Sequence, residues 1–417
     1  MIFSDILTVK DGMIKGPFGG DVKKSLFVKK ANDTYKVYEQ SVVAENDYTV
    51  GDYYLPKKYV EKKLHRFLIK PGDILLTGAG TLGLLSIVPD GIEEGIINQA
   101  LIRIRLNESV IYKPYFMYYF PWYIKRVAIR LNGDSVIPNL PPLSVLKKIE
   151  IDIPPIAEQQ KIADFLSKID EAIQKNENTI RLSERLMREI YDYWFVQFDF
   201  PDENGRPYKS SGGEMVYDEK LKREIPKGWK ACNILDIADW VGGAQPPKST
   251  FIYEPRNGYV RFIQNRDYAD DNYKTWIPES KSNKICDRLD IMMDKYGDAG
   301  RIRFGLAGAY NVALAKIAIE KENLREYIRG FLSSEAIYQY LYNACMASTR
   351  ASLNEEILGN LNLAMPSEEI LNQYQTIAEQ NVQLILTLSD ENKQLASLRD
   401  WLLPMLMNGQ VKIAGDL

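Results

Sequence analysis

Residues 154–201 read PPIAEQQKIADFLSKIDEAIQKNENTIRLSERLMREIYDYWFVQFDFP, and this stretch predicts a long helix that packs along another helix. No glycine or proline interrupts it between Pro155 and Pro201. Positions 156–195 would span roughly 60 Å at ~1.5 Å per residue, and a helix of that length needs a partner. The predicted seam repeats at alternating steps of four and three and consists of Ile162, Leu166, Ile169, Ile173, Asn176, Ile180, Ser183, Met187, Ile190 and Trp194.

The partner helix is expected near the C-terminus, where the same spacing returns. Both helices are preceded by proline, in IDIPP (151–155) and in LAMPS (363–367). Proline suits a helix start because its missing N–H would have no intrahelical acceptor there. The predicted seam of the second helix consists of Ile370, Tyr374, Ile377, Asn381, Leu384, Leu388, Glu391, Leu395, Leu398, Leu402 and Met405.

The composition is that of an ordinary globular protein. Of the 417 residues, 45% are hydrophobic and 26% are charged, and the length predicts two to three domains. No apolar run approaches the ~20 residues that span a bilayer, and the first residues do not form a secretion signal. Cys232, Cys286 and Cys345 are widely spaced and odd in number, which argues against disulfides and a cysteine zinc site. We therefore expect a cytoplasmic protein that makes no membrane contact.

Charge is divided unevenly along the chain, although the net charge is only −3. Residues 1–150 hold 21 lysines and arginines against 16 acidic residues, and residues 226–365 hold 18 against 17. Each helical stretch is acidic, with 6 against 10 over 151–200 and 3 against 7 over 366–417. The globular parts are thus neutral to mildly basic, although charged helix surfaces are common and this signal alone decides little.

The chain contains one long internal repeat. FLIKPGDILLTGAGTLG (67–83) and RLDIMMDKYGDAGRI (288–302) both read as a strand that ends in a glycine-rich turn. The sequence therefore indicates one unit used twice, each copy a mixed α/β globule of about 140 residues followed by a long helix, a size that can bury its own core. The matched positions lie 212 to 217 residues apart: Asp73 with Asp290, Asn98 with Asn311, Tyr115 with Tyr327 and Pro154 with Pro366.

Short strands bounded by Gly, Pro and Asn turns are expected within the globules. Residues 102, 104 and 106 are apolar and alternate with Arg103 and Arg105, which predicts a strand with one buried face. Residues 202–229 are polar, rich in Gly and Pro, and without an apolar period, which predicts a linker rather than a core element. The predicted boundaries are globules at 1–153 and 226–365, helices at 154–200 and 366–417, and a linker at 201–225.

Most enzyme classes require residues that this sequence lacks. His65 is the only histidine, so catalytic triads and histidine metal sites have too few members, and a structural, exposed or half-buried side chain is the better interpretation. GGAQPPKS (242–249) lacks the glycine that precedes the lysine of a P-loop. GAGTLG (78–83) leads into another strand rather than a helix, so it is interpreted as a turn and not as a dinucleotide site.

Two classes of function stay open at this point. One is a scaffold whose tandem modules bind protein or carbohydrate, since the globules are only mildly basic. The other, weaker one is a nuclease, since carboxylates and a lysine can bind magnesium and activate water. Such triplets arise by chance in a charged chain; here they are Asp270 or Asp271 with Glu279 and Lys281, and Asp52 with Glu61 and Lys63.

Several sequence motifs of this chain resemble those of one known protein family. The tandem α/β units with proline-preceded helices resemble the specificity subunits of type I restriction–modification systems over nearly the whole chain. The second helix start, PSEEILNQY (366–374), departs from the EQ-type pattern of that family. The motifs that carry the resemblance are PPIAEQQKIADFL (154–166), EIYDYWFVQFDFP (189–201), IPKGW (225–229) and LRDWLLPMLMNGQVKI (398–413).

The resemblance implies an α+β protein with two tandem target recognition domains and an internal pseudo-two-fold repeat. The two long helices are expected to form an antiparallel coiled coil that spaces the domains. Each domain would read one half of a bipartite, non-palindromic DNA site, which requires a rigid spacing of ~34–36 Å or a multiple. The family further implies a non-catalytic chain in complex with methylation subunits, two of them, and restriction subunits. S-adenosylmethionine, ATP and magnesium would belong to those partners, and this chain would bind no cofactor or metal.

DNA contacts are expected from cations, hydroxyls and amides near glycine-rich turns and loop tips. In the first globule the candidates are Lys15, Lys23, Lys24, Thr77, Thr81 and Asn139. In the second globule they are Gln245, Lys248, Lys295, Arg301, Arg303, Arg350 and Asn354. Charge reversal at Lys248 and Arg301 is expected to weaken binding to cognate and random DNA alike.

Apolar residues outside the seam suggest a further surface on the first helix. Phe165, Leu182 and Leu186 lie off the predicted seam. An apolar strip that intramolecular packing leaves over commonly marks an interaction site. These three residues are therefore predicted to contribute to docking of a methylation subunit.

Overall fold

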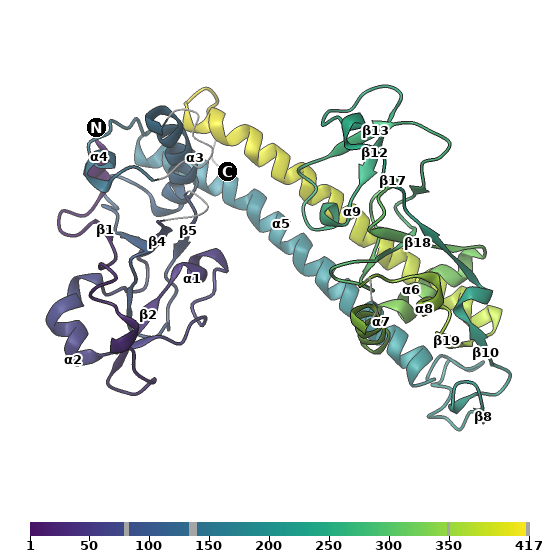
Figure 1. The fold of residues 1–417 in the computed structure, drawn as a ribbon. Helices are drawn as coiled ribbons and strands as arrows, with labels where there is room; N and C mark the ends of the chain where they lie inside the picture. Colours follow the sequence, from purple (N-terminus) through teal and green to yellow (C-terminus); the bar gives the residue numbers. More distant parts are fainter. Residues whose placement is uncertain (79–82, 133–139, 348–350, 414–417) are drawn as a thin grey trace. The chain divides into compact units, whose positions relative to one another are not determined.

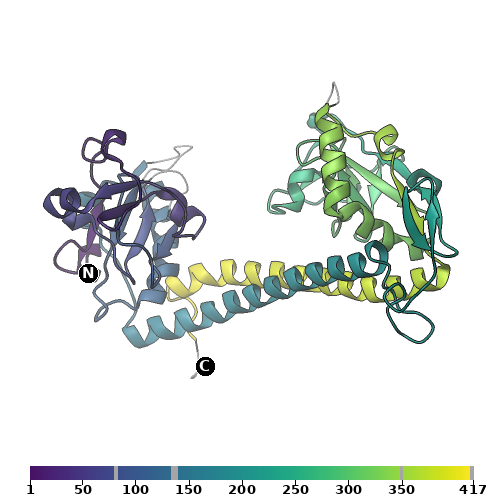
Figure 2. The same cartoon turned by 90° about the horizontal axis from the view of Figure 1, so that it is seen from below.

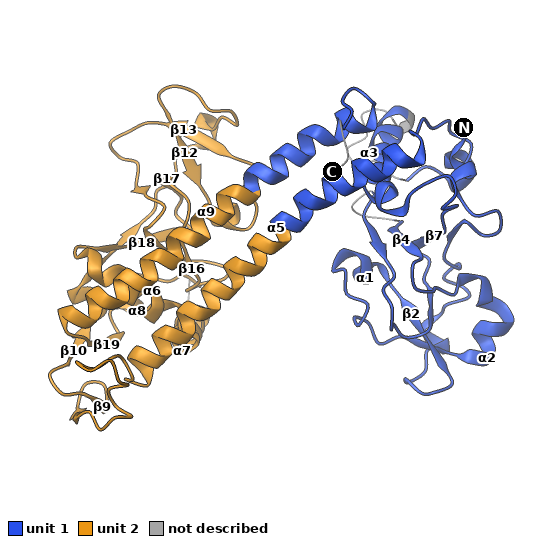
Figure 3. Ribbon diagram, turned by 180° about the vertical axis from the view of Figure 1, so that it is seen from behind, with its two compact units in different colours: residues 1–173, 393–417 blue, residues 174–392 orange. Residues whose placement is uncertain are grey.

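The computed structural model describes residues 1–78, 83–132, 140–347 and 351–413, and the chain divides into two compact units. Unit 1 comprises residues 1–173 and 393–417, and unit 2 comprises residues 174–392 (Figure 3). Each unit therefore combines one globule with one segment from each of two long helices. The GAGTLG turn lies largely outside the described residues.

The two long helices are α5 (Ile156–Tyr191) and α9 (Glu368–Met407) (Figure 1). A π-helical turn, Asp192–Val196, continues α5. α5 starts directly after Pro155 and α9 starts two residues after Pro366. The backbone N–H groups of Glu158 and Gln159 donate to the carbonyl of Pro155 at 2.9 and 3.0 Å. The predicted helix positions are therefore confirmed.

Within each unit the two helices pair in antiparallel directions (Figures 1 and 2). In unit 2, the Asn176 amide donates to Asn392 at 2.9 Å, while the rings of Tyr191 and Tyr374 lie 6.2 Å apart. Residues nearer the C-terminal end of α5 therefore pair with residues nearer the N-terminal end of α9. In unit 1, Arg399 donates to Asp170 at 2.7 Å, and Leu166 shares a core cluster with Leu406 and Met407.

The predicted seam is right for α5 and wrong at four of its eleven positions on α9, Ile377, Leu384, Glu391 and Leu398, which are exposed. Every predicted seam residue of α5 is buried or half-buried. On α9, Ile377, Leu384 and Leu398 are 36%, 40% and 43% exposed, so the true seam is displaced by about one position. Since α9 covers a globule as well as α5, it buries a wider stripe than a two-helix seam. That stripe contains Leu371, Gln375, Ala378, Val382, Ile385 and Leu386.

Unit 1 contains two sheets. The larger is antiparallel with strand order β1-β7-β4-β5, and the smaller has order β3-β2-β6 with β2 and β6 parallel. The strands are β1 (Met13–Lys15), β2 (Thr34–Tyr38), β3 (Tyr54–Pro56), β4 (Ile74–Thr77), β5 (Leu85–Ile87), β6 (Gly95–Ile97) and β7 (Leu101–Ile104). The helices are α1 (Gln40–Ala44), α2 (Lys57–Tyr59), a π-helical turn (Val60–Leu64), α3 (Lys113–Asn132) and α4 (Leu143–Leu146).

Unit 2 repeats this arrangement with two four-stranded sheets, one of order β11-β18-β15-β16 and the other of order β13-β12-β17-β14. The strands are β10 (Lys230–Asn233), β11 (Ala238–Gly242), β12 (Tyr259–Ile263), β13 (Thr275–Pro278), β14 (Ile285–Cys286), β15 (Ile291–Asp294), β16 (Ile302–Arg303), β17 (Gly308–Tyr310), β18 (Leu314–Ile319) and β19 (Asn362–Met365). The helices are α6 (Arg325–Ser333), α7 (Glu335–Ala347) and α8 (Glu355–Leu358).

Paired residues confirm the internal repeat at atomic detail. The carboxylate of Asp73 accepts from the backbone N–H of Lys70 at 3.0 Å and lies 4.0 Å from the guanidinium of Arg103 on the neighbouring strand β7. Asp290 in unit 2 accepts from the N–H of Asp287 at 2.8 Å and pairs with Lys316 at 3.2 Å. The same turn and the same cross-strand ion pair thus precede β4 and β15.

Arg103 corrects the prediction of a half-buried strand. All four residues of β7 are buried, and Arg103 is 1% exposed. Core clusters cover both faces of the larger sheet, so the alternating pattern does not mark solvent. One terminal nitrogen of the guanidinium donates to the carbonyls of Arg66 and Leu68 at 2.8 and 2.5 Å, and the group lies beside Asp73. Burial lowers the pKa of Arg103 to about 10.

Residues 202–229 are not the plain linker that was predicted. They form a hairpin of β8 (Met215–Asp218) and β9 (Arg223–Pro226). The aromatic rings of Phe200 and Trp229 stack at 5.1 Å, and Ile225 is 1% exposed within the core of unit 2. A few isolated apolar anchors hold this segment, and because they follow no period, a pattern search does not find them.

None of the helices in the described part of the chain combines the length and apolar character that crossing a bilayer requires.

Candidate nucleic-acid interface

In unit 1 the loop that follows β1 lies against the turn that precedes β7. The N–H of Gly16 donates to the carbonyl of Leu101 at 2.9 Å. A Cβ atom at Gly16 would lie 1.8 Å from the carbonyl oxygen of Asn98, so only glycine permits this approach. The Asn98 side chain holds the turn by accepting from the N–H of Ala100 at 3.0 Å.

Unit 2 builds the same contact. The N–H of Gly243 donates to the carbonyl of Leu314 at 3.0 Å, and a Cβ at Gly243 would lie 1.9 Å from the carbonyl oxygen of Asn311. The Asn311 side chain accepts from the N–H of Ala313 at 3.2 Å. We call this contact the loop junction: residues 16–21 with 98–100 in unit 1, and residues 243–248 with 311–313 in unit 2.

The loop junction of unit 1 carries exposed aromatic, amide and cationic groups. Phe18 is 87% exposed, and Gln99 and Lys15 are exposed beside it. These side chains line a pocket of about 650 Å3 together with Arg66, which donates to Asp11 at 2.9 Å. Cations and amides on open loops are the groups that contact phosphates and base edges.

The loop junction of unit 2 presents a different set of groups on the same backbone. Gln245 and Lys248 are exposed on the loop, and Lys248 begins a 3-10 turn (Lys248–Thr250). Val312 is 38% exposed on the turn. The half-buried Lys295 reaches toward the start of the loop, where a Cβ at Gly242 would lie 3.9 Å from its Nζ.

The sequence analysis identified only part of a basic surface in unit 1, Lys23 and Lys24. The segment KKYVEKKLHR (57–66) folds as α2 and the π-helical turn, and it packs with the segment 22–27 in one small core. The hydroxyl of Tyr59 ties the two segments by donating to the carbonyl of Asp21 at 2.9 Å. The density of lysines in this segment was the available signal. We call the exposed lysines of the two segments the lysine surface: Lys23, Lys24, Lys58, Lys62 and Lys63.

The structure exposes some of the predicted DNA contacts of unit 1 and buries another. Lys15 is exposed at the end of β1, next to the loop junction, and Lys23 and Lys24 are exposed on the lysine surface. Thr77 is 2% exposed at the end of β4, so it does not present its side chain to a ligand, and we drop it as a candidate. The predicted contacts outside the described residues are Thr81, Asn139 and Arg350.

Several residues of unit 2 that were predicted to contact DNA already bind other groups of the protein. Arg303 donates to the buried carboxylate of Asp294 at 2.9 Å, and desolvation by burial raises the pKa of that carboxyl. Arg301 pairs with Asp298 at 2.9 Å and lies over the ring of Tyr338. The exposed Asn354 caps α8 by accepting from the N–H of Ile357 at 3.0 Å. Gln245 and Lys248 are therefore the better candidates.

An exposed apolar strip runs along the helix pair of unit 2. On α9, ion pairs to the globule, Arg288 with Asp390 and Arg325 with Glu379, mark the covered side. In Figure 2, the sheets of unit 2 lie on one side of the helices. Helical periodicity places the exposed Ile377 and Leu384 of α9 on the opposite side. Together with two exposed leucines of α5 they are called the outer helix patch: Leu182, 65% exposed, Leu186, 46%, Ile377, 36%, and Leu384, 40%.

Phe165 differs from the other two predicted partner contacts. It is half-buried and packs against the core of unit 1. Only part of its ring is therefore available to a partner.

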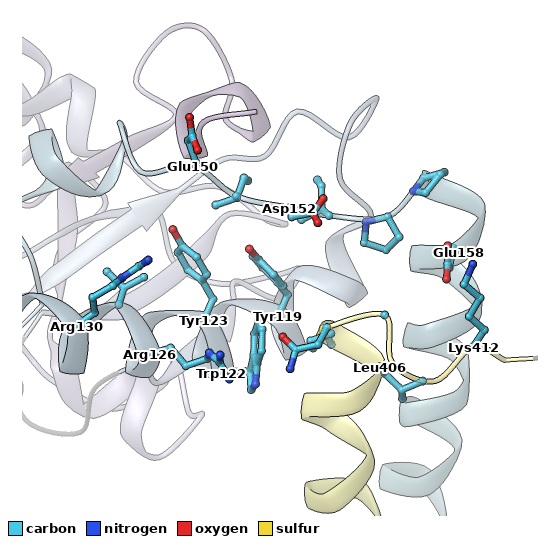
Figure 4. Close-up of a pocket in the computed structure, with 18 of the residues that line it drawn as sticks. Tyr119, Trp122, Tyr123, Arg126, Arg130, Glu150, Asp152, Glu158, Leu406 and Lys412 are labelled. Carbon is cyan, nitrogen blue, oxygen red and sulfur yellow. The ribbon is translucent and has the colours of Figure 1, made fainter.

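A second pocket of unit 1, of about 830 Å3, lies between α3, the segment before α5 and the end of α9 (Figure 4). Tyr119 and Trp122 line it, and the Arg126 guanidinium lies over the Trp122 ring at 5.0 Å. Its lining also includes Glu150 and Asp152. Both charge signs are present, so the pocket offers no one-sign field for phosphate.

Catalytic groups do not gather in the part of the chain that the structure describes. His65 is exposed, and no group of three or more His, Cys, Asp or Glu side chains in that part could hold a metal ion. Asp271, a candidate in the weaker magnesium triplet, pairs instead with Arg261. Burial raises the pKa of the Cys286 thiol to about 12, which disfavours the nucleophilic thiolate.

Comparisons with known proteins match this architecture. The model of the type I restriction modification DNA specificity domain matches residues 19–182 and again residues 226–397. The chain is 24% identical to the type I restriction enzyme MjaIX specificity subunit of Methanocaldococcus jannaschii, over 87% of this chain and 83% of that protein. It is 22% identical to the HindI specificity subunit of Haemophilus influenzae, over 82% and 87%. The crystal structure of a type I system S subunit from M. genitalium aligns with a TM-score of 0.53 at 16% identity, covering 97% and 95%.

Proposed function

The chain belongs to the DNA specificity subunits of type I restriction–modification systems, and from this premise we propose that its two units read the two halves of a bipartite, asymmetric DNA site. Members of this family recognise DNA and do not catalyse the reactions of the complex. Sequence is read by side chains at base edges, while phosphate contacts hold the register. The loop junctions and the lysine surface are the parts of this chain that fit those two tasks.

One observation carries the proposal: the loop junction occurs twice on the same backbone with different exposed side chains. Gly16 and Gly243 allow the same close approach in both units. The exposed residues nevertheless differ, with Phe18 and Gln99 in unit 1 against Gln245 and Val312 in unit 2. A repeated scaffold with different tips suits two half-sites of different sequence.

The chain acts in an assembly with DNA and with other subunits of its system. We propose that two methylation subunits dock on the outer sides of α5 and α9, and that restriction subunits join them. S-adenosylmethionine, ATP and magnesium would be bound by those subunits, and the complex would work in the cytoplasm. The outer helix patch supports this proposal because it exposes four apolar residues on helix surfaces that are otherwise charged. Exposed apolar patches of this kind commonly mark protein–protein interaction sites.

The function is tested by co-expression with the neighbouring methylation subunit and mapping of methylated adenines in genomic DNA. The proposal predicts one bipartite motif with a fixed spacer between two unlike halves. A stable complex that leaves DNA unmethylated would favour the scaffold alternative. Absence of any complex would show that the helices have been misinterpreted as a docking surface.

The lysine surface gives a prediction of its own. Lys62→Glu with Lys63→Glu is expected to weaken binding of the complex to cognate and random DNA alike, because phosphate contacts carry no sequence information. If each lysine neutralises one phosphate, affinity falls roughly thirtyfold at 0.15 M salt, and the slope of log K against log salt becomes shallower by ~1.8. Fluorescence anisotropy across a salt series measures both.

The control for this experiment carries the same charge change on the hairpin of residues 202–229. Lys220→Glu with Lys222→Glu replaces two exposed lysines there and should leave the salt slope unchanged. An equal loss of affinity in both double variants would mean that net charge, and not the lysine surface, governs binding.

A further inference from the structure

The two loop junctions share a chemical pattern that their sequences hide. In unit 1 the loop presents an apolar side chain, Phe18, and the turn presents a carboxamide, Gln99. In unit 2 the loop presents the carboxamide, Gln245, and the turn presents the apolar Val312. Each junction therefore offers one exposed carboxamide and one exposed apolar group, with the two positions exchanged.

The carboxamides are not committed to the fold. A Cβ at Gly19 would lie 3.1 Å from Oε1 of Gln99, so this side chain extends over the loop that carries Phe18. Within the described residues, Gln99 makes no side-chain hydrogen bond, and Gln245 makes only a 3.4 Å contact with the carbonyl of Pro246. Both amides can therefore still donate and accept together.

The two apolar side chains also do not pack into the protein core. Phe18, at 87% exposed, belongs to none of the core clusters in the described part of the chain, and neither does Val312. Single exposed apolar residues are ordinary on protein surfaces. An apolar residue beside a free carboxamide at equivalent places in two divergent units is a more specific coincidence.

We propose that each loop junction reads an A·T base pair in the major groove, with Gln99 and Gln245 as the base-reading residues. A glutamine carboxamide matches adenine because it accepts from N6 and donates to N7 at once. An apolar side chain beside it matches the thymine methyl group, which only an A·T pair displays. The inference rests on the proposed function, since it names what the two units read.

The test maps adenine methylation by the whole complex with single variants of this chain. Gln99→Ala relaxes one position in one half of the motif, so methylation of sites with another base there rises about tenfold to hundredfold relative to wild type. Gln245→Ala does the same in the other half only. Gln99→Glu shifts the preference at the same position toward C·G, because a carboxylate accepts from cytosine N4. Asn32→Ala, an exposed carboxamide elsewhere in unit 1, leaves the motif unchanged.

The outcomes separate this inference from the function on which it rests. If the wild-type complex methylates no bipartite motif, the proposed function fails. If the wild-type motif is bipartite and both alanine variants keep every base preference, the base-reading assignment is overturned. Relaxation of the same half by Gln99→Ala and Gln245→Ala would overturn it as well.

Discussion

Leu182→Glu combined with Leu186→Glu is expected to abolish assembly with the methylation subunit while leaving the chain folded. The two side chains are 65% and 46% exposed, so glutamate meets solvent in the free protein and stability changes little. In the complex, each leucine would lose ~1.5–3 kcal/mol of apolar burial, and two carboxylates would have to be desolvated. Affinity should therefore fall at least about a hundredfold, as measured by co-purification and by titration of the purified subunits.

A matched control uses the same helix. Arg181→Glu with Arg188→Glu changes two exposed residues of α5 that the helical period places away from the outer helix patch, and the complex should survive. Circular dichroism of both double variants should match the wild type. An intact complex with Leu182→Glu and Leu186→Glu would remove the outer helix patch from the docking surface.

Phe195→Ala is expected to destabilise unit 2 by about 3–5 kcal/mol, the usual loss for a buried phenylalanine in a packed core. The Phe195 ring is 5% exposed and lies 4.6 Å from the ring of Tyr327 and 4.9 Å from that of Tyr374. It thereby joins the end of α5 to α6 and to the beginning of α9. The effect should appear as a lower denaturant midpoint for the transition of unit 2.

The adjacent residue supplies the control for this variant. Val196 is 49% exposed, so Val196→Ala should change the free energy of unfolding by less than about 0.5 kcal/mol. Equal midpoints for the two variants would mean that the aromatic contacts at the end of α5 do not hold unit 2 together.

The first long helix was predictable because its two determinants are local. The prolines before α5 and the absence of breakers define its limits, and its seam faces a single neighbour over most of its length. On α9 the same pattern misled, since Ile377 and Leu384 keep the four-three spacing but face outward. The buried stripe includes Gln375 and Ala378 as well as large apolar residues, because the globule that α9 also covers widens the buried face. Periodicity alone does not contain that information.

The globules were predictable as a repeat but not in their interiors. Asn98 and Asn311 match in sequence because both cap the turn of the loop junction, a local task that demands asparagine. The burial of Arg103 depends on the carbonyls of Leu68 and Arg66, which lie 35 and 37 positions earlier in the sequence. The hairpin of residues 202–229 likewise depends on distant aromatic contacts. Tertiary partners of this kind leave no periodic trace in the sequence.

The candidate site was predictable by type more than by residue. Glycine-rich loops pointed to the junctions, and Gln245 and Lys248 are exposed there. Arg303 and Asn354 have the same chemistry, but the fold uses their hydrogen bonds. Gln99 was missed because it lies in the short turn just before an alternating strand, and no glycine marks that turn as a loop. Only the packing of Gly16 against Asn98 brings it to the loop of unit 1.

The central claim is that each unit reads its own half of the DNA site, and a domain exchange tests it most directly. Residues 1–153 would be replaced by the corresponding segment of another family member, and the methylated motif of the assembled complex would be mapped. The account predicts that one half of the motif changes to that of the donor while the other half and the methylating activity persist. A change in both halves, or in neither with activity retained, would contradict it.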